Sequence, residues 1–395
     1  MADGTKIEWT DATWNPITGC SVVSPGCTNC YAMKLAGTRL THHPSREGLT
    51  RNTKAGPVWT GAVRFNPQWL DEPLRWKKPR MIFVCAHGDL FAEGVPDEWI
   101  DQIFAVMALA PQHTFQVLTK RPERMRQYLR DGELLDRLMS AACRIHSADG
   151  ADWSADIHCG HDRGLPLPNV WLGISAEDQK RADERIPILL DTPAAVRWIS
   201  GEPLLGDINW KRWLPTRRKA FRPGGEPFLA PHYYMTKCEH CQWTGSSELC
   251  DLINYGDDAD VACPSCHNLI LGDELPALDW IVAGGESGRG ARPMHPAWAR
   301  SLRDQCFAAG VPFHFKQWGN WTDLSDIEPK PTCVEERIFT TTGEVIGVGV
   351  DYGRKGMVDP EWRERGAAWM GRCSKSYAGR LLDGIEHNGF PEARR

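Results

Sequence analysis

Short apolar runs alternate with amphipathic segments along most of the chain. Apolar runs predict strands at Met81–Cys85, Thr114–Leu118, Val170–Ile174, Val196–Ile199, Trp280–Ala283 and Pro312–Phe315, with a further short strand around Trp14–Thr18. Because the runs are apolar throughout rather than alternating, they indicate parallel strands covered on both faces. Helices are predicted at Trp99–Ala110, which Asp97 opens, at Glu177–Leu190, and at Pro296–Ala309, which ends at Gly310. This order predicts a parallel α/β sheet, either open or closed into a full or partial barrel.

The alternation breaks in two places, which divides the chain. Residues 206–278 are rich in proline, glycine and charged residues, which predicts an inserted module. We therefore expect a barrel whose first part is 1–205 and whose last part is 279–320. Residues 321–395 are polar and glycine-rich, and they are expected to form a C-terminal extension with a helix around Ser376–Ile385.

Composition excludes several classes of protein. The chain has 395 residues, 42% hydrophobic and 25% charged, which is ordinary for a soluble globular protein. No apolar run approaches the roughly 20 residues of a membrane span, and the N-terminus lacks a signal-peptide pattern, so we expect a cytoplasmic protein. Cytoplasmic thiols stay reduced, so the 14 cysteines are read as metal ligands, catalytic thiols or core residues. The net charge of −5 excludes a protein coated in positive charge but permits a local basic groove.

Three cysteines share one Gly/Pro/Ser-rich loop near the start. Cys20, Cys27 and Cys30 have the spacing C-x6-C-x2-C. Three cysteines from one loop can bind three irons of a [4Fe–4S] cluster and leave the fourth iron open. The alternative is a structural zinc site, or ordinary loop cysteines, completed from elsewhere in the chain.

A second cysteine group lies in the inserted module. Cys238, Cys241, Cys263 and Cys266 form two C-x2-C pairs, which is the pattern of a zinc ribbon. Four thiolates leave no open coordination position, so the zinc would be structural.

A third, looser group of cysteines and histidines has two interpretations. Its residues could bind a second zinc or could be ordinary surface and core residues: Cys143, His146, His158, Cys159 and His161.

Polar residues follow nearly every predicted strand. In a βα barrel, the loops after the C-terminal ends of the strands carry the chemistry. Individually, Lys120 and Arg121 could begin a solvated helix, and Glu202 and Glu286 could cap helices. Together the set predicts a functional site: Gly88, Asp89, Thr119, Lys120, Arg121, Ser175, Glu177, Glu202, Gly284, Gly285, Glu286, Ser287, Lys316 and Gln317.

Basic stretches interleaved with tryptophan occur at Arg75–Arg80, Lys120–Arg130 and Lys211–Lys219. They suit phosphate contacts with aromatic stacking on bases, or they are ordinary solvated surface.

Seven motifs in order resemble those of the phage-associated three-cysteine-motif family, over roughly residues 5–320. They are the WNP…GC…SPGC-x2-CYA start, GDLF at Gly88–Phe91, LTKRPER at Leu118–Arg124, NVWLGIS at Asn169–Ser175, SGEPLLG at Ser200–Gly206, IVAGGESGRGARPM at Ile281–Met294 and FKQWG at Phe315–Gly319. A three-cysteine loop after the first strand of a βα barrel also resembles the radical S-adenosylmethionine (radical SAM) superfamily. That superfamily usually has C-x3-C-x2-C, with an aromatic residue where this chain has Asn29.

The resemblance implies a partial parallel (β/α) barrel of radical SAM type with an inserted zinc ribbon. It implies a [4Fe–4S] cluster on the three-cysteine loop, reduced by a donor such as flavodoxin or ferredoxin. The cluster cleaves S-adenosylmethionine (SAM) to a radical that abstracts hydrogen from substrate. By the same analogy, Gly88, Asp89, Ser175 and Arg292 are expected cofactor contacts, and Glu202, Glu286 and Lys120 are expected catalytic residues.

Radical SAM proteins of this kind are implicated in thymidine hypermodification of bacteriophage DNA, which evades host restriction. The resemblance therefore implies an isomerase, in the host cytoplasm, that converts N-linked to C-linked glycinyl-thymidine in DNA. One alternative is a DNA repair enzyme of the photoproduct-lyase type. Another is a non-catalytic, zinc-containing protein that binds nucleic acid or a protein partner.

Overall fold

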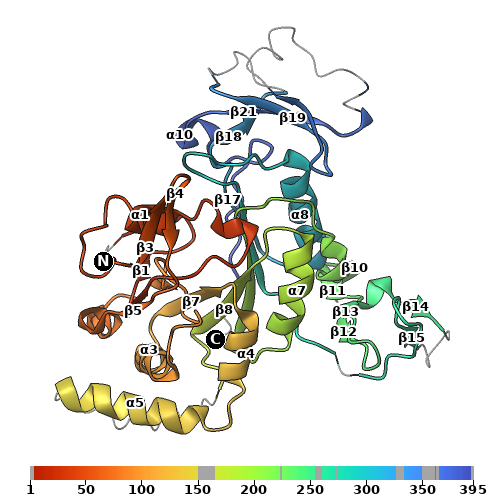
Figure 1. Ribbon diagram of the computed structural model, residues 1–395. Helices are drawn as coiled ribbons and strands as arrows, with labels where there is room; N and C mark the ends of the chain where they lie inside the picture. Colours follow the sequence, from red (N-terminus) through yellow and green to blue (C-terminus); the bar gives the residue numbers. More distant parts are fainter. Residues whose placement is uncertain are drawn as a thin grey trace. The chain divides into compact units, whose positions relative to one another are not determined.

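The computed structural model describes residues 4–149, 165–222, 225–253, 260–272, 274–325, 333–348, 361 and 364–392 (Figure 1). The chain forms two compact units. The first comprises Met1–Ser175 and Thr192–Ser200, and the second comprises Ala176–Asp191 and Gly201–Glu392. Within the described residues, none of the helices combines the length and the apolar character that a membrane span requires.

The main sheet confirms the prediction of a mixed α/β fold with parallel strands. It has seven strands in the order β1 (Ala12–Trp14), β6 (Met81–Val84), β7 (Thr114–Thr119), β8 (Val170–Ser175), β9 (Val196–Gly201), β16 (Trp280–Gly284) and β17 (Phe313–Gln317). The pairings β1–β6, β6–β7, β7–β8, β8–β9 and β16–β17 are all parallel. All six residues of β8 and of β9 are buried, as the unbroken apolar runs predict. The sheet is open, with β1 and β17 at its edges.

The strand expected around Trp14–Thr18 is divided in two. β1 ends at Trp14, and a separate strand, β2 (Ile17–Thr18), pairs antiparallel with β5 (Arg64–Phe65). Pro16 stands between the two strands and has no backbone N–H with which to continue the ladder.

The first unit also contains helices and a small hairpin. Its remaining elements are the 3-10 helices η1 (Pro25–Cys27) and η2 (Pro67–Trp69), the helices α1 (Tyr31–Ala36), α2 (Glu72–Arg75), α3 (Asp97–Leu109), α4 (Pro122–Leu129) and α5 (Leu134–Asp149), and the hairpin β3 (Thr50–Thr53)–β4 (Gly56–Trp59). Pro96 is the N-cap residue of α3, so Asp97 lies in the first turn rather than before it. There its negative carboxylate lies near the positive end of the helix dipole, which stabilises the helix.

The second unit confirms two predicted helices and corrects a third. In α7 (Gln179–Leu190), the Asp178 side chain accepts a hydrogen bond from the backbone N–H of Arg181. Gly310, in a left-handed conformation with φ 66°, ends α8 (Pro296–Ala309). The helix expected around Ser376–Ile385 was wrong beyond its first turn, because α10 covers only Lys375–Ala378. Gly379 follows it at φ 67°, which turns the chain out of the helix.

Small antiparallel sheets make up much of the second unit. Between β9 and β16 lie the 3-10 helices η3 (Trp210–Arg212) and η4 (Ser247–Leu249) and the pairs β10 (Arg217–Phe221)–β11 (Pro227–Pro231), β12 (Met235–Lys237)–β13 (Thr244–Ser246) and β14 (Asp251–Leu252)–β15 (Val261–Ala262). After β17, a four-stranded sheet has the order β18 (Trp321–Asp323), β21 (Ala368–Arg372), β19 (Glu336–Phe339), β20 (Val345–Val348). The end of the chain returns to β17, where the backbone N–H of Gly389 donates to the carbonyl of Phe313.

Tryptophans fill much of the interior. The fully buried ones are Trp9, Trp14, Trp198, Trp210, Trp213, Trp280 and Trp321. Trp198 packs edge-on against Trp9 at 5.3 Å between ring centroids. A Cβ atom at Gly173 would lie 2.3 Å from the Trp198 indole, so a glycine in the NVWLGIS run is required for this packing.

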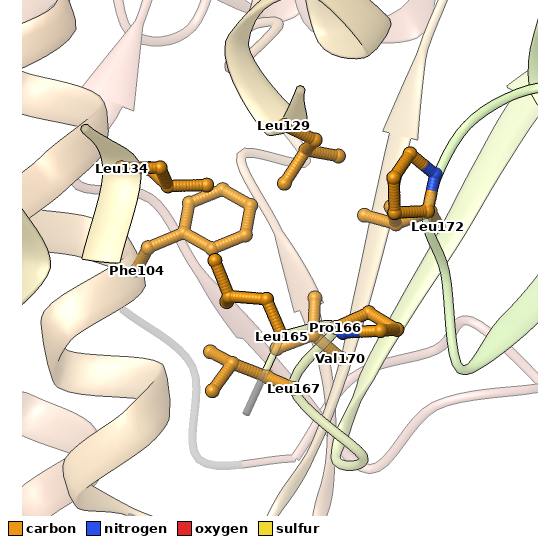
Figure 2. A pocket seen from close by; sticks show the side chains of 9 residues that line it. Phe104, Leu129, Leu134, Leu165, Pro166, Leu167, Val170 and Leu172 are labelled. Carbon is orange, nitrogen blue, oxygen red and sulfur yellow. The ribbon is translucent and has the colours of Figure 1, made fainter. Parts of the chain in front are cut away.

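A pocket in the first unit belongs to this apolar interior. Figure 2 shows Phe104, Leu129 and Leu172 turned toward it from α3, α4 and β8, and its labelled lining is apolar. It offers no charged or hydrogen-bonding side chain to a ligand, so we treat it as a packing gap.

Candidate functional site

The three-cysteine loop is held by local structure in the first unit. Cys20 follows β2, Cys27 ends η1, and Cys30 is the N-cap residue of α1. The backbone N–H of Cys30 donates to the carbonyl of Cys27 over 3.2 Å. Cys27 is buried, and Cys20 and Cys30 are half-buried.

Two glycines allow this loop to lie against the segment after β6. Gly19 has φ 95°, and a Cβ atom there would lie 2.3 Å from the Ala62 carbonyl oxygen. Gly88 forms a parallel bridge with Gly19, and its own Cβ atom would lie 3.0 Å from the Gly19 oxygen. A larger residue at Gly88 would press against the backbone that leads into the cysteine loop, and one at Gly19 would collide with Ala62.

The three thiols influence one another electrostatically. Burial raises the pKa of Cys20 to about 12, with a smaller contribution in the same direction from Cys30 and Cys27. Burial also raises the pKa of Cys30, against the opposing effect of Lys120. In the described part of the chain these three sulfurs do not form a group whose atoms all lie within 4.8 Å of one another.

Arg121 connects the cysteine loop to the segment after β6. Its Nη1 lies 3.4 Å from Cys20 Sγ and 2.9 Å from Asp89 Oδ2. Its Nε and Nη2 form a bidentate pair with Glu93, each at 3.1 Å, and Nη2 also donates to Ser21 Oγ over 2.6 Å. Although partial burial opposes it, the Arg121 hydrogen bond lowers the pKa of Glu93. Every nitrogen of the guanidinium group is therefore engaged.

Asp89, an expected cofactor contact, is buried and hydrogen-bonded within the protein. Oδ1 accepts from Thr119 Oγ1 over 2.7 Å and from the backbone N–H of Phe91 over 3.0 Å. Oδ2 accepts from Arg121 and from the backbone N–H of Lys120 over 3.1 Å. The carboxylate thus joins the ends of β6 and β7 and orients Arg121 toward Cys20.

Lys120 and Ser175, predicted separately from two strand ends, lie together. Lys120 Nζ donates to Ser175 Oγ over 3.0 Å. The Lys120 charge also reaches Cys30, where it opposes the rise in pKa that burial causes. An ammonium group here can pair with a ligand carboxylate near the cysteine loop.

Sequence reasoning missed a second buried cation beside this loop. Arg46 is 5% exposed, and its Nη2 lies 2.7 Å from His87 Nδ1. Burial, and then the charge of Arg64, lowers the pKa of Arg46 to about 10. Within the described residues Arg46 has no carboxylate partner, so it favours an anion nearby. The only available sequence signal was that His87 immediately precedes Gly88-Asp89.

Four other predicted polar residues form two ion pairs in the second unit. Lys316 Nζ lies 3.2 Å from Glu202 Oε1, and a Cβ atom at Gly284 would lie 2.6 Å from the same oxygen. Glu286 is buried, and its Oε2 accepts from both the backbone N–H and the Nε of Arg292 over 2.9 Å. Two strand-end carboxylates therefore each hold a cation.

The second cysteine group forms a cluster that could bind a metal ion. The Sγ atoms of Cys238, Cys241, Cys263 and Cys266 all lie within 4.8 Å of one another. Two of the sulfur pairs are 3.6 Å apart. A tetrahedral zinc with Zn–S bonds of about 2.3 Å separates its sulfurs by about 3.8 Å, so this group can bind a metal such as zinc.

The two C-x2-C turns of this cluster have the same backbone geometry. Gln242, at φ 64°, donates its N–H to the Cys238 carbonyl, and His267, at φ 58°, donates its N–H to the Cys263 carbonyl, each over 2.9 Å. Hydrogen bonds from Asn268 lower the pKa of Cys266 to about 6, which favours the thiolate.

The third group and the basic stretches are only partly described. His158, Cys159 and His161 lie outside the described residues, and Cys143 is exposed. Several cations of the basic stretches interact within the protein. Arg124 pairs with Asp97, Arg75 pairs with Asp71, and Arg80 lies over the Trp76 ring. Arg121 is buried.

Comparison with known proteins identifies one family. Residues 4–391 match the family described as "Protein of unknown function (DUF5131)". No curated protein and no solved structure matches the chain. The match includes the three-cysteine loop, the polar strand ends and the four-cysteine cluster. The chain therefore belongs to this DUF5131 family of unknown function.

Proposed function

We propose that the protein is a radical SAM enzyme whose [4Fe–4S] cluster is held by Cys20, Cys27 and Cys30. The observation that carries this proposal is the geometry of the loop. Three mutually interacting thiols share one loop, they do not form a single-ion group, and one of them accepts an N–H from Arg121. Three ligands leave one iron of such a cluster open to SAM.

The residues around the loop fit the carboxylate group of SAM. When bound, the cluster and SAM would supply a carbon-centred radical capable of hydrogen abstraction. Arg46 and Lys120 provide positive charge beside the cysteines without a carboxylate of their own in the described residues. Lys120, oriented by Ser175, would bind the carboxylate of SAM, and the backbone at Gly88 would contact its adenosine part. Asp89 would act through Arg121, because four internal donors occupy its carboxylate.

For the substrate we propose modified thymidine in bacteriophage DNA, with isomerisation of N-linked to C-linked glycinyl-thymidine. The motif resemblance supports this substrate. A shift of a substituent from nitrogen to carbon is difficult by polar chemistry and accessible to a carbon radical. Glu202 and Glu286, each paired with a cation, are the proposed catalytic carboxylates.

For the four-cysteine cluster we propose a structural zinc ribbon. The pairing of four sulfurs and the two matching turns support this role. Four thiolate ligands leave no coordination position for a substrate.

The first test is metal content and SAM cleavage after anaerobic purification. We expect roughly four irons per chain, in addition to zinc, and 5′-deoxyadenosine when the protein is reduced with SAM present. Cys20→Ala, Cys27→Ala and Cys30→Ala should each lose both. Cys143→Ala, at an exposed cysteine on α5, is the matched control and should keep both. Zinc without iron in the anaerobically reconstituted wild type would contradict the proposal and favour the non-catalytic alternative.

The substrate is tested by mass spectrometry of nucleosides from treated DNA. DNA carrying N-linked glycinyl-thymidine should yield the C-linked isomer at unchanged mass and altered retention time. Restoration of thymine from irradiated DNA would instead identify a photoproduct lyase.

A further inference from the structure

An exposed basic hairpin in the second unit has no role in the site described above. Strand β10 carries Arg217, Arg218 and Lys219, all exposed, and Arg222 follows it (Figure 1). From Arg217 to Pro231 the sequence has these four basic residues and one acidic residue, Glu226, whereas the whole chain carries a net charge of −5. Positive charge is therefore concentrated on this hairpin.

The hairpin contributes little to any hydrophobic core. β10 pairs only with β11, over five residues from Arg217↔Pro231 to Phe221↔Pro227, and no third strand joins them in the described residues. Isolated two-stranded ribbons are marginally stable, so such an element needs another reason to exist. Phe221 is 66% exposed, and Phe228 and Leu229 are each 38% exposed.

Each face of the ribbon places a cation beside an aromatic ring. Side chains alternate along a strand, so Lys219 and Phe221 share one face while Arg218 and Arg222 share the other. Arg222 lies over the Phe228 ring, 5.6 Å from its centroid. In the described part of the chain, Arg218 and Lys219 form no ion pair, and the Arg222–Glu226 pair is exposed at 3.7 Å.

Arg217 has a different position from its neighbours. Its Cδ lies 3.2 Å from the point where a Cβ atom at Gly310 would lie. Gly310 is at the C-terminus of α8, which is the negative end of the helix dipole. Arg217 therefore lies beside the end of α8, whereas Arg218 and Lys219 are exposed.

We propose that the β10–β11 hairpin binds single-stranded DNA along the open edge of β10, from which side chains of both faces can be reached. Arg218, Lys219 and Arg222 would contact phosphates, and Phe221 would stack on a base. Alternating cations and exposed rings match the repeat of phosphate and base along a single strand. The inference deepens the proposed function and rests on it for the choice of DNA as the nucleic acid. The hairpin itself needs neither iron nor SAM to bind.

The test is the binding of a fluorescein-labelled, thymine-rich single strand to the full-length protein, followed by anisotropy at several salt concentrations. Arg218→Ala/Lys219→Ala should weaken binding and reduce the slope of log K against log salt by about 1.4, because each lost phosphate contact removes about 0.7. Phe221→Ala should weaken binding roughly fivefold or more and leave the slope unchanged. The matched control is Arg51→Ala/Lys54→Ala, which removes the same charge from exposed positions of the first unit outside the basic stretches and should change little.

Three results would overturn the proposal: no binding by the wild type, equal loss in both double variants, or a preference for anionic lipid vesicles that the hairpin variants abolish. Thermal unfolding of each variant checks that it is folded. Iron content of the same wild-type preparation separates the two hypotheses. If the protein holds iron but its DNA binding does not depend on the hairpin, only this inference is contradicted. If DNA binding depends on the hairpin but the protein holds no iron, only the radical SAM assignment is contradicted.

Discussion

Arg121 Nη1 lies 3.4 Å from Cys20 Sγ and, through the same nitrogen, 2.9 Å from Asp89 Oδ2. One guanidinium group thus joins a thiol to a carboxylate that lies 32 residues away from it in sequence. The Arg121 and Asp89 side chains are 8% and 7% exposed, so the pair is shielded from water. The position of Cys20 therefore depends on a buried ion pair, and this has consequences for both stability and chemistry.

Loss of Arg121 should destabilise the first unit strongly. Arg121→Met leaves Asp89 buried with an uncompensated charge, which costs about 3–5 kcal/mol of unfolding free energy. Urea unfolding at neutral pH measures this cost. Arg124→Met breaks the partly exposed pair with Asp97 and should cost at most about 1 kcal/mol. Adding Asp89→Asn to Arg121→Met should recover part of the lost unfolding free energy. If Arg121→Met and Arg124→Met cost the same unfolding free energy, the argument is contradicted.

The same bond should influence the proposed cluster. An N–H donated to a cysteine sulfur withdraws electron density and makes an iron–sulfur cluster easier to reduce. We therefore expect a more negative midpoint potential in Arg121→Met than in the wild type, measured by dye-mediated redox titration with electron paramagnetic resonance. Arg124→Met should leave the potential unchanged. A variant that keeps its iron and its wild-type potential would show that the contact only supports the loop.

The sheet could be predicted from the sequence because its strands are buried on both faces. Runs such as Val170–Ile174 are apolar throughout, which is typical of a parallel strand covered on both faces. Short-range rules failed where one residue ends an element. Pro16 divides the first strand, and Gly379 stops a helix that the sequence pattern would continue. The chain has 18 tryptophans, and burial of residues such as Trp198 and Trp280 assigns several of them to the core.

The sequence predicted which residues at the strand ends belong to the candidate site, but not which of them bond to one another. Lys120 and Ser175 were each predicted from position, and their hydrogen bond depends on the neighbouring placement of β7 and β8. The internal bonding of Asp89 depends on loop geometry that no spacing reveals. The four-cysteine cluster was fully predictable, because each C-x2-C turn fixes two sulfurs within four residues.

Removal of one cluster cysteine should release the metal and loosen only its surroundings. Cys241→Ser should reduce bound zinc from about one per chain to a small fraction of that value, because three ligands no longer close a tetrahedral site. Elemental analysis gives the metal content, and limited proteolysis should then cut between Lys237 and Asn268. Cys250→Ser is the matched control, because Cys250 is not among the four grouped sulfurs. Unchanged zinc in Cys241→Ser would contradict the assignment.

His314 should make the second unit sensitive to acid. It is 1% exposed on β17, both ring nitrogens lack a hydrogen-bond partner, and its ring packs against Phe390 at 5.4 Å. Burial, reinforced by the charges of Arg380 and Lys316, lowers its pKa to about 4. An unfolded histidine has a pKa of about 6.5, so the unfolded chain takes up the proton first as the pH falls.

The stabilising effect of neutral His314 is therefore complete above about pH 6.5 and is lost as the pH falls toward 4, by up to about 3 kcal/mol. His314→Phe keeps a ring in the apolar site and removes the buried nitrogens, so the second unit should unfold with a weaker pH dependence and gain stability most at pH 4–5. Denaturant unfolding between pH 4 and 8, monitored by tryptophan fluorescence, measures both effects. His42→Phe, at an exposed histidine in the first unit, should leave the pH profile unchanged. If His314→Phe keeps the wild-type acid sensitivity, the proton uptake belongs to another group.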